Sequence, residues 1–174
     1  TEAAPTSAPR PTNPPVVQPT HPPAPPTPVP PTATNPPPVS GHGITGSLTL
    51  CNKGVSGDGF RHYYAGNKER VCFVEVITNT TNQARTYGYL GVQVTAISGG
   101  ASFFHTSWSG DLSICGGCTG PSSGGWEDGL TIATPGTYSL TLAICYSNVN
   151  TCQTAAGEWE TLTAGTTIVA DPAP

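Results

Sequence analysis

The stretch that decides the fold is residues 136–146, with the sequence GTYSLTLAICY. Large apolar residues alternate along it with smaller or polar ones, and this period of two is the signature of a β-strand with one buried face. The first set, Tyr138, Leu140, Leu142, Ile144 and Tyr146, is expected to face a core. The other face carries Cys145, which we therefore expect to point away from the core.

Short runs of β-branched and aromatic residues, separated by clusters of Gly, Asn and Ser, lie on both sides of this stretch. They predict about seven strands, at 46–51, 70–78, 86–98, 101–107, 129–133, 136–146 and 158–169, the last broken near 164–165. No segment has a helical period. The pattern is typical of an all-β sandwich. In 70–78 the charged Glu75 is expected to face solvent, which turns Cys72, Val74 and Val76 inward.

The composition divides the chain into two regimes. Sixteen of the 20 prolines lie in residues 1–38, whereas all 21 glycines lie after residue 40. The first regime has too little apolar surface to fold alone, and polyproline II is its expected conformation. We therefore predict an extended stalk or linker at 1–40, a single β-sandwich domain at 41–170, and a tail or the start of a second linker at 171–174.

Six cysteines in so short a domain predict a disulfide framework in an oxidising compartment. Fifteen pairings are possible; we favour nearest neighbours, Cys51 with Cys72, Cys115 with Cys118, and Cys145 with Cys152. The chain begins with Thr1 and contains no Met, from which we expect removal of a signal peptide and an extracellular or cell-surface location. No apolar run approaches the ~20 residues that span a bilayer, so membrane insertion of the mature chain is not expected.

The charged residues argue against several classes of function. They make up only 9% of the chain, with a net charge of −4, which excludes a basic surface for nucleic acid. Paired carboxylates would indicate a glycosidase, but the candidates, Glu127 with Asp128 and Glu158 with Glu160, are expected on solvated surfaces. Cys115 and Cys118 lack a second pair for zinc, and the four histidines are scattered. We expect no catalytic residues, metal or cofactor, and thus no enzyme.

Aromatic side chains and glycosylation sites are the remaining candidates. We expect Trp108, Trp126, Tyr63 and Tyr64 to be contact or ligand residues, because aromatic rings in polar surroundings often form contact surfaces. Trp159, between two glutamates, is expected to be buried. Asn79 begins the sequon Asn-Thr-Thr at the end of a strand, where a glycan would project into solvent. In the stalk, O-glycosylation is expected at Thr6, Thr12, Thr20, Thr27, Thr32 and Thr34.

Residues 134–140, TPGTYSL, resemble the corner before the penultimate strand of immunoglobulin-like sandwiches. That resemblance implies an immunoglobulin-like fold. The Pro/Thr-rich tract resembles linkers of secreted glycosidases and O-glycosylated stalks of surface proteins. We expect a structural glycoprotein, a subunit that forms a filament or other assembly with copies of itself through a stalk that packs on neighbours or projects outward. The alternative is a carbohydrate-binding module or adhesin that contacts cell-surface polysaccharide.

Overall fold

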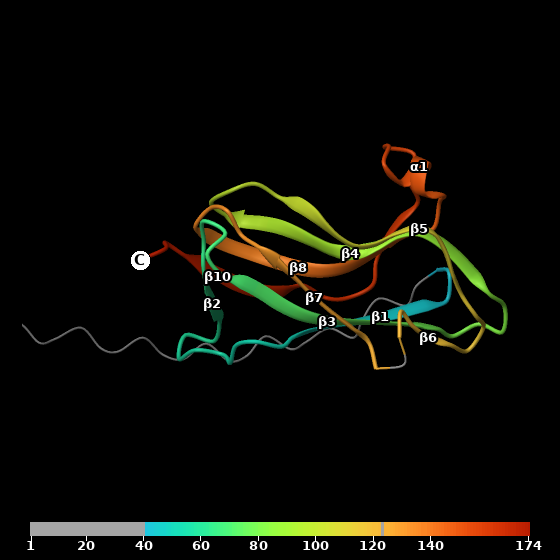
Figure 1. Cartoon of the computed structure of the whole chain (residues 1–174), viewed down its shortest axis with the longest axis horizontal. Coiled ribbons are helices and arrows are strands. Elements are labelled where there is room, and N and C mark those ends of the chain that lie inside the picture. The colour runs from blue at the N-terminus through green and yellow to red at the C-terminus, as the bar shows by residue number, and fades with distance from the viewer. Residues whose placement is uncertain (1–40, 123) are drawn as a thin grey trace, which may run out of the picture. The chain divides into compact units, whose positions relative to one another are not determined.

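The computed structural model describes residues 41–122 and 124–174, which lie in the compact unit Thr34–Pro174. The predicted stalk at 1–40, with its six candidate threonines, lies outside the described residues. Two β-sheets face each other and form the domain (Figure 1). The prediction of a nearly all-β, disulfide-bonded fold is confirmed.

Sheet A consists of β1 (Ile44–Leu50), β3 (Arg70–Asn79), β6 (Thr119–Gly120) and β7 (Trp126–Thr131). Sheet B has the order β2-β10-β8-β4-β5, with β9 also paired to β8. Its strands are β2 (Arg61–Tyr64), β4 (Arg85–Ser98), β5 (Phe103–Ile114), β8 (Gly136–Cys145), β9 (Trp159–Thr161) and β10 (Thr166–Asp171). Strand pairs are antiparallel except for β2 with β10. A short helix, α1 (Val149–Cys152), stands off sheet B.

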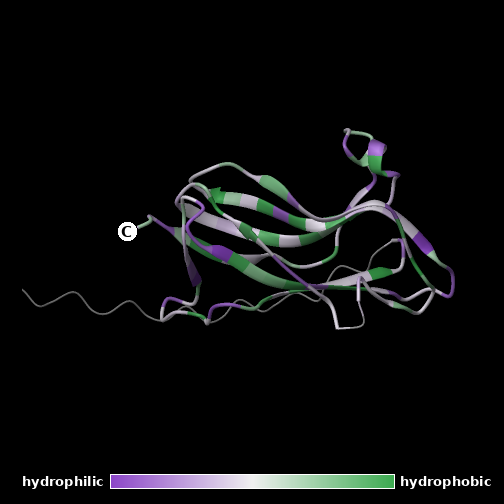
Figure 2. Ribbon diagram, in the orientation of Figure 1, coloured by the Kyte–Doolittle hydropathy of each residue, from purple (hydrophilic) through white to green (hydrophobic). Residues whose placement is uncertain are grey.

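The core fills the space between the sheets, and apolar residues alternate with polar ones along the strands that enclose it (Figure 2). In β8 the side chains of Tyr138, Leu140, Leu142 and Ile144 are buried, as the alternation predicts. Burial of these side chains contributes about 1.5–3 kcal/mol for each aliphatic residue. None of the helices in the described part of the chain is long and apolar enough to cross a membrane.

The predicted buried face of β3 is wrong, because the structure exchanges the inward and outward faces of this strand. Val71, Phe73, Glu75 and Ile77 are fully buried, whereas Cys72, Val74 and Val76 are only partly buried. Phe73 and Ile77 fill the core, and the period of two then carries the carboxylate between them inward. The charge of Glu75 was therefore a misleading guide to the exposed face of this strand.

Further corrections concern the predicted elements and their boundaries. β2 and β6 were missed, and α1 is a single turn that has no periodic signal. β5 continues to Ile114 and β7 begins at Trp126, so Trp108 and Trp126 both lie in strands. Asp171 is the last residue of β10 rather than the start of a tail, and its carbonyl accepts a hydrogen bond of 2.8 Å from Ala65 N–H.

Three disulfides join Cys51 to Cys72, Cys115 to Cys118, and Cys145 to Cys152, which are the nearest-neighbour pairs. They indicate an oxidising, extracellular environment. Cys145 is buried although it alternates with the core residues of β8, because the loop that carries Cys152 covers it. The disulfide thus attaches the α1 loop to the outer side of sheet B.

Candidate functional site

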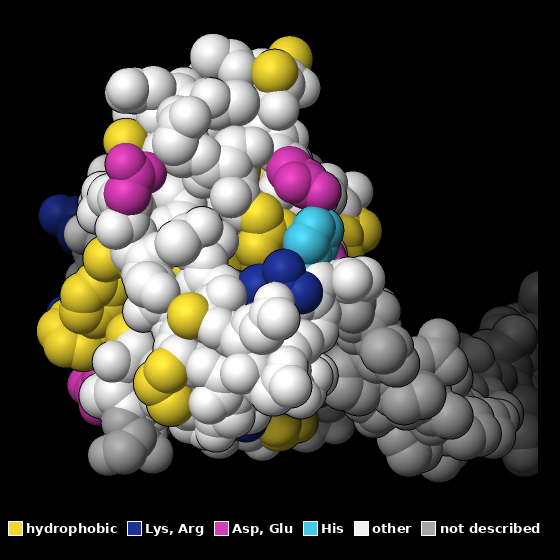
Figure 3. All heavy atoms as spheres, turned by 90° about the vertical axis from the view of Figure 1, so that its right-hand side faces the viewer, with side chains coloured by type: hydrophobic (Ala, Val, Ile, Leu, Met, Phe, Trp, Pro, Cys, Tyr) yellow, Lys and Arg dark blue, Asp and Glu magenta, His cyan; other side chains and the backbone are white. Residues whose placement is uncertain are grey.

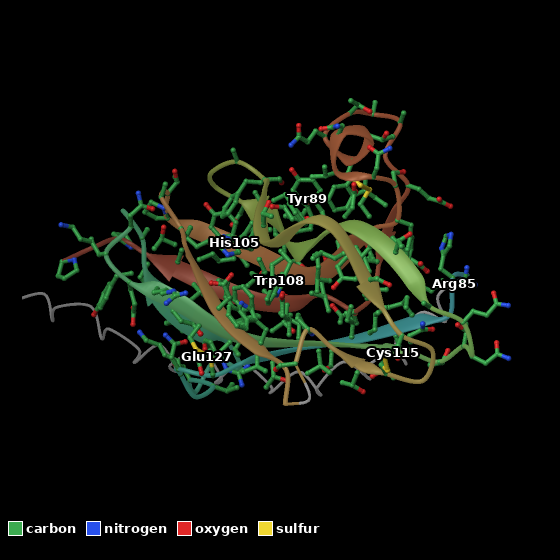
Figure 4. All side chains as sticks on the ribbon, turned by 45° about the vertical axis from the view of Figure 1, so that its right-hand side comes forward. Arg85, Tyr89, His105, Trp108, Cys115 and Glu127 are labelled. Carbon is green, nitrogen blue, oxygen red and sulfur yellow. A yellow bond between two sulfur atoms is a disulfide. The ribbon has the colours of Figure 1, made fainter. Side chains whose placement is uncertain are left out.

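A groove of about 480 Å³ lies on the outer side of sheet B, between β4, β5, β9 and the α1 loop. Its volume falls within the range of small-molecule sites in proteins. The residues that line it are Tyr89, Gln93, Phe104, Thr106, Cys152, Gln153 and Trp159. Figure 4 shows Tyr89 on the α1 side of sheet B, whereas Trp108 lies in the layer between the sheets.

Trp159 is the largest side chain of the groove, and 41% of it is exposed. The expectation that it is buried is therefore wrong. Its indole Nε1–H donates to the carbonyl of Cys152 at 3.3 Å, which fixes the orientation of the ring. Phe104 packs edge-on against it at a centroid distance of 4.8 Å, and Tyr89 lies 6.2 Å away at a tilt of 37°. Three aromatic rings thus meet in one groove.

Two glycines make this arrangement sterically possible. A Cβ atom on Gly91 would lie 2.1 Å from the carbonyl oxygen of His105 and 3.0 Å from the ring of Phe104. A Cβ atom on Gly157 would lie 2.8 Å from Nε1 of Trp159. Larger residues at either position would displace backbone or an aromatic ring, so the shape of the groove depends on both glycines.

Polar groups complete the lining. The amide of Gln153 donates to the hydroxyl of Tyr89 at 2.6 Å. The amide of Gln93 donates to the carbonyls of Val94 and Phe103 at 3.3 and 3.1 Å. These bonds use the –NH₂ group of Gln93 and one N–H of Gln153, and they leave both Oε1 atoms as acceptors and the second N–H of Gln153 as a donor. None of the lining residues is charged.

The α1 loop is held by bonds that leave little freedom at the rim of the groove. Besides the disulfide of Cys152, the side chain of Asn148 caps α1 by accepting from Thr151 N–H at 2.9 Å. Asp111 of β5 accepts from Val149 N–H at 3.1 Å. The rim is therefore tied both to β8 and to β5. A site held in this way does not have to be ordered by its ligand.

The aromatic residues singled out from the sequence lie elsewhere. Trp108 and Trp126 form an edge-to-face pair at 4.8 Å across the two sheets, with Trp126 41% exposed. Trp108 is half-buried and packs against the core. Tyr63 is only 1% exposed and is also a core residue, while Tyr64 is exposed. The groove aromatics were missed because they come from three separate strands.

Asn79 does not project into solvent. Its side chain is fully buried, and its Nδ2 donates to the carbonyls of Gln83, Ile114 and Cys115 at 2.8–3.3 Å. Its Oδ1 accepts from the backbone N–H and the hydroxyl of Thr81. The amide thus joins the end of β3 to the end of β5. A glycan on Nδ2 is incompatible with these contacts, which corrects the expected position.

Three of the four candidate carboxylates, Asp128, Glu158 and Glu160, form ion pairs with histidine. Burial alone would raise the pKa of Asp128, but hydrogen bonds from His105 at 2.9 Å and from Gly129 N–H hold it below its usual value. Glu158 and Glu160 both contact His42, at 3.0 and 3.3 Å. Figure 3 shows the sparse distribution of charge on one end of the domain.

The group of potential metal ligands found among the described residues does not form a metal site. One group of potential ligands, Cys51, Cys72 and Glu127, lies close together. Its two cysteines form a disulfide, so neither sulfur is a thiolate that could bind an ion. The remaining carboxylate is a single ligand, which does not make a metal site.

Glu75 is the one unusual acid in the core. Neither carboxylate oxygen has a hydrogen-bond partner of ordinary geometry, and the buried hydroxyl of Ser107 is also unsatisfied. The pKa of Glu75 is raised to about 7: burial is the main cause, the nearby hydroxyl of Ser107 opposes it, and the negative charge of Asp128 adds to it. The side chain is fully enclosed, so its titration affects stability rather than ligand binding.

The chain matches no protein-family model, and no curated protein shows significant similarity to it.

Proposed function

We propose that this protein is an extracellular carbohydrate-binding domain whose ligand lies in the groove of sheet B. The observation that carries the proposal is Trp159, a 41% exposed tryptophan held in a fixed orientation within an uncharged groove. Large exposed aromatic side chains in a preformed concavity mark a binding site rather than a packing defect. The expected absence of catalysis agrees with this role and stays a prediction.

The lining suits a sugar for a chemical reason. One face of a pyranose ring exposes C–H groups that are apolar and slightly positive, and these pack against the negative face of an aromatic ring. Its hydroxyls need hydrogen-bond partners when they leave water. Trp159 and Phe104 offer the apolar surface, and the Oε1 atoms of Gln93 and Gln153 offer acceptors. Thr106, an exposed hydroxyl in the same groove, adds both a donor and an acceptor.

We further propose that the fold is immunoglobulin-like. Two observations support this assignment. Strands β1, β3 and β7 of one sheet face β10, β8, β4 and β5 of the other, an order that immunoglobulin-like sandwiches share. The hydroxyl of Tyr138 donates to the carbonyl of Thr134 at 2.7 Å, which is the hydrogen bond of a tyrosine corner. This fold hosts many functions, so it supports an extracellular module but does not identify a ligand.

The test is binding to a panel of polysaccharides, with Trp159→Ala compared with Trp126→Ala. The two tryptophans have the same exposed fraction, 41%, but only Trp159 lies in the groove. We expect Trp159→Ala to abolish measurable binding and Trp126→Ala to retain it. Equal loss in both variants, or full binding by Trp159→Ala, would refute the assignment.

A second candidate function is the structural subunit expected from the sequence. The observation that favours it is the edge position of β5, a 12-residue strand that pairs only with β4 in the described part of the chain. Such an edge is available for strand pairing with another copy. Negative-stain microscopy of the full chain tests this role. Dispersed monomers at all concentrations would refute it, without affecting the groove proposal.

A further inference from the structure

We infer that the ligand of the groove is an individual, neutral polysaccharide chain rather than a crystalline polysaccharide surface or an anionic glycan. This inference rests on the proposed function and adds the shape and charge of the ligand. Three features of the described residues carry it: the angles between the aromatic rings, the height of the rim, and the balance of donors and acceptors.

The ring angles exclude a flat ligand. A crystalline surface presents sugar rings in one plane, and stacking on it requires aromatic rings that are coplanar and level. Here the planes of Phe104 and Trp159 are inclined by 71°, and those of Tyr89 and Trp159 by 37°. At most one of the three rings can stack on a flat face. A single chain, by contrast, is enclosed by rings at different angles, because it presents a different side to each.

The rim points to the same ligand. The loop that carries α1 stands above sheet B beside the groove (Figure 1), and the disulfide of Cys152 fixes its base. A rigid plane placed against this side of the domain meets the raised loop before it reaches the floor formed by β4 and β5. A chain that lies alongside the loop does not meet this obstacle.

The polar groups indicate a neutral ligand. The acceptor atoms of Gln93 and Gln153 face a ligand that donates hydrogen bonds, as hydroxyl groups do. Carboxylates and sulfates are bound most strongly by cationic donors, and no lining residue is cationic. The whole chain has a net charge of −4, which also opposes the approach of an anionic polymer.

The experiment measures binding of the full chain to three classes of polymer. The first is soluble neutral polysaccharide, namely mixed-linkage β-glucan, xyloglucan, galactomannan and arabinoxylan, by affinity electrophoresis and calorimetry. The second is crystalline cellulose and crystalline chitin, by sedimentation. The third is anionic polysaccharide, namely polygalacturonate and alginate. We expect retardation by at least one polymer of the first class, release by its oligosaccharide fragments, and loss of both in Trp159→Ala.

A second variant tests the acceptors without removing an aromatic ring. Gln153→Ala removes one Oε1 atom and the bond to Tyr89, and is expected to weaken binding threefold to about tenfold, the effect of one lost hydrogen bond. Near-ultraviolet circular dichroism checks that the fold is retained.

The possible outcomes separate the inference from the function on which it rests. Binding restricted to crystalline or anionic polymers, lost in Trp159→Ala, would overturn the inference and leave the carbohydrate-binding role intact. Binding to soluble neutral polymers that is unchanged in both Trp159→Ala and Gln153→Ala would overturn the groove as the site. Failure to bind any polymer of the three classes would overturn the proposed function as well.

Discussion

Replacing Glu75 with Gln is expected to stabilise the domain at neutral and alkaline pH. In the folded state the pKa of this buried carboxyl is raised from 4.5 to about 7, chiefly by burial. The folded protein thus holds a proton that the unfolded chain releases. Stability from this group is fully present below pH ~4.5 and is lost as the pH rises through ~7. At about 1.4 kcal/mol per pKa unit, the shift from 4.5 to about 7 corresponds to a loss of about 3 kcal/mol in the free energy of unfolding.

Gln has nearly the same shape as a protonated Glu and does not titrate. The free energy of unfolding of Glu75→Gln, relative to wild type, should therefore increase by about 3 kcal/mol between pH 4 and pH 8. Urea unfolding at several pH values, monitored by tryptophan fluorescence, measures this difference. Hydrogen bonds to Asp58 and Asp171 raise the pKa of His62, so this group also makes the stability depend on pH. Its contribution is common to both proteins and cancels in the comparison.

Glu127→Gln is the matched control, since it makes the same chemical change at an exposed position on the strand that pairs with β3. It is expected to change the pH profile little. The reasoning would be refuted by a Glu75→Gln profile parallel to that of wild type from pH 4 to pH 8. Equal pH effects in the two variants would refute it too.

Three further predictions concern the groove and its supports. The double variant Cys145→Ala with Cys152→Ala should lose about 2 kcal/mol of stability in urea unfolding, because the disulfide closes only a short loop. Its glycan affinity, measured by calorimetry, should fall more than tenfold. Gly91→Ala should lower the melting temperature and disorder the groove, because its Cβ atom meets a β5 carbonyl at 2.1 Å; near-ultraviolet circular dichroism reports both. Asn79 should carry no glycan in protein secreted by eukaryotic cells, as intact-mass spectrometry will show, and Asn79→Ala should destabilise the domain by several kcal/mol.

The sequence predicted the elements whose patterns are local. The alternation in 136–146 correctly identified the buried face of β8, and the large breaks rich in Gly, Asn and Ser separated most strands. In contrast, β3 contains apolar residues on both faces, so the charged Glu75 in its middle decided the prediction. Glu75 is buried because its strand is pinned by Phe73 and Ile77 on the same face. The free-energy cost of burying this carboxylate becomes apparent only when the opposite sheet, which covers it, is taken into account.

The candidate site was harder to predict because its residues are distant in the sequence. Tyr89 and Trp159 are 70 positions apart and meet because β4 and β9 both pair with β8. Trp126, which a polar sequence context favours as a contact residue, is exposed but packs against Trp108 on the opposite sheet. One signal was available: Trp159 follows a cysteine-closed loop. A disulfide next to an aromatic residue indicates that the aromatic is held in place.

The role of that disulfide explains how a small domain can keep a rigid binding groove outside its core. The α1 loop has a single four-residue helix, and Cys152 is the buried residue within it. A loop with so little apolar surface cannot order itself. The bond to Cys145 attaches it to β8, the central strand of sheet B, and the carbonyl of Cys152 then fixes Trp159. Since the core clusters lie on the other face of β8, losing this disulfide should impair binding more than folding.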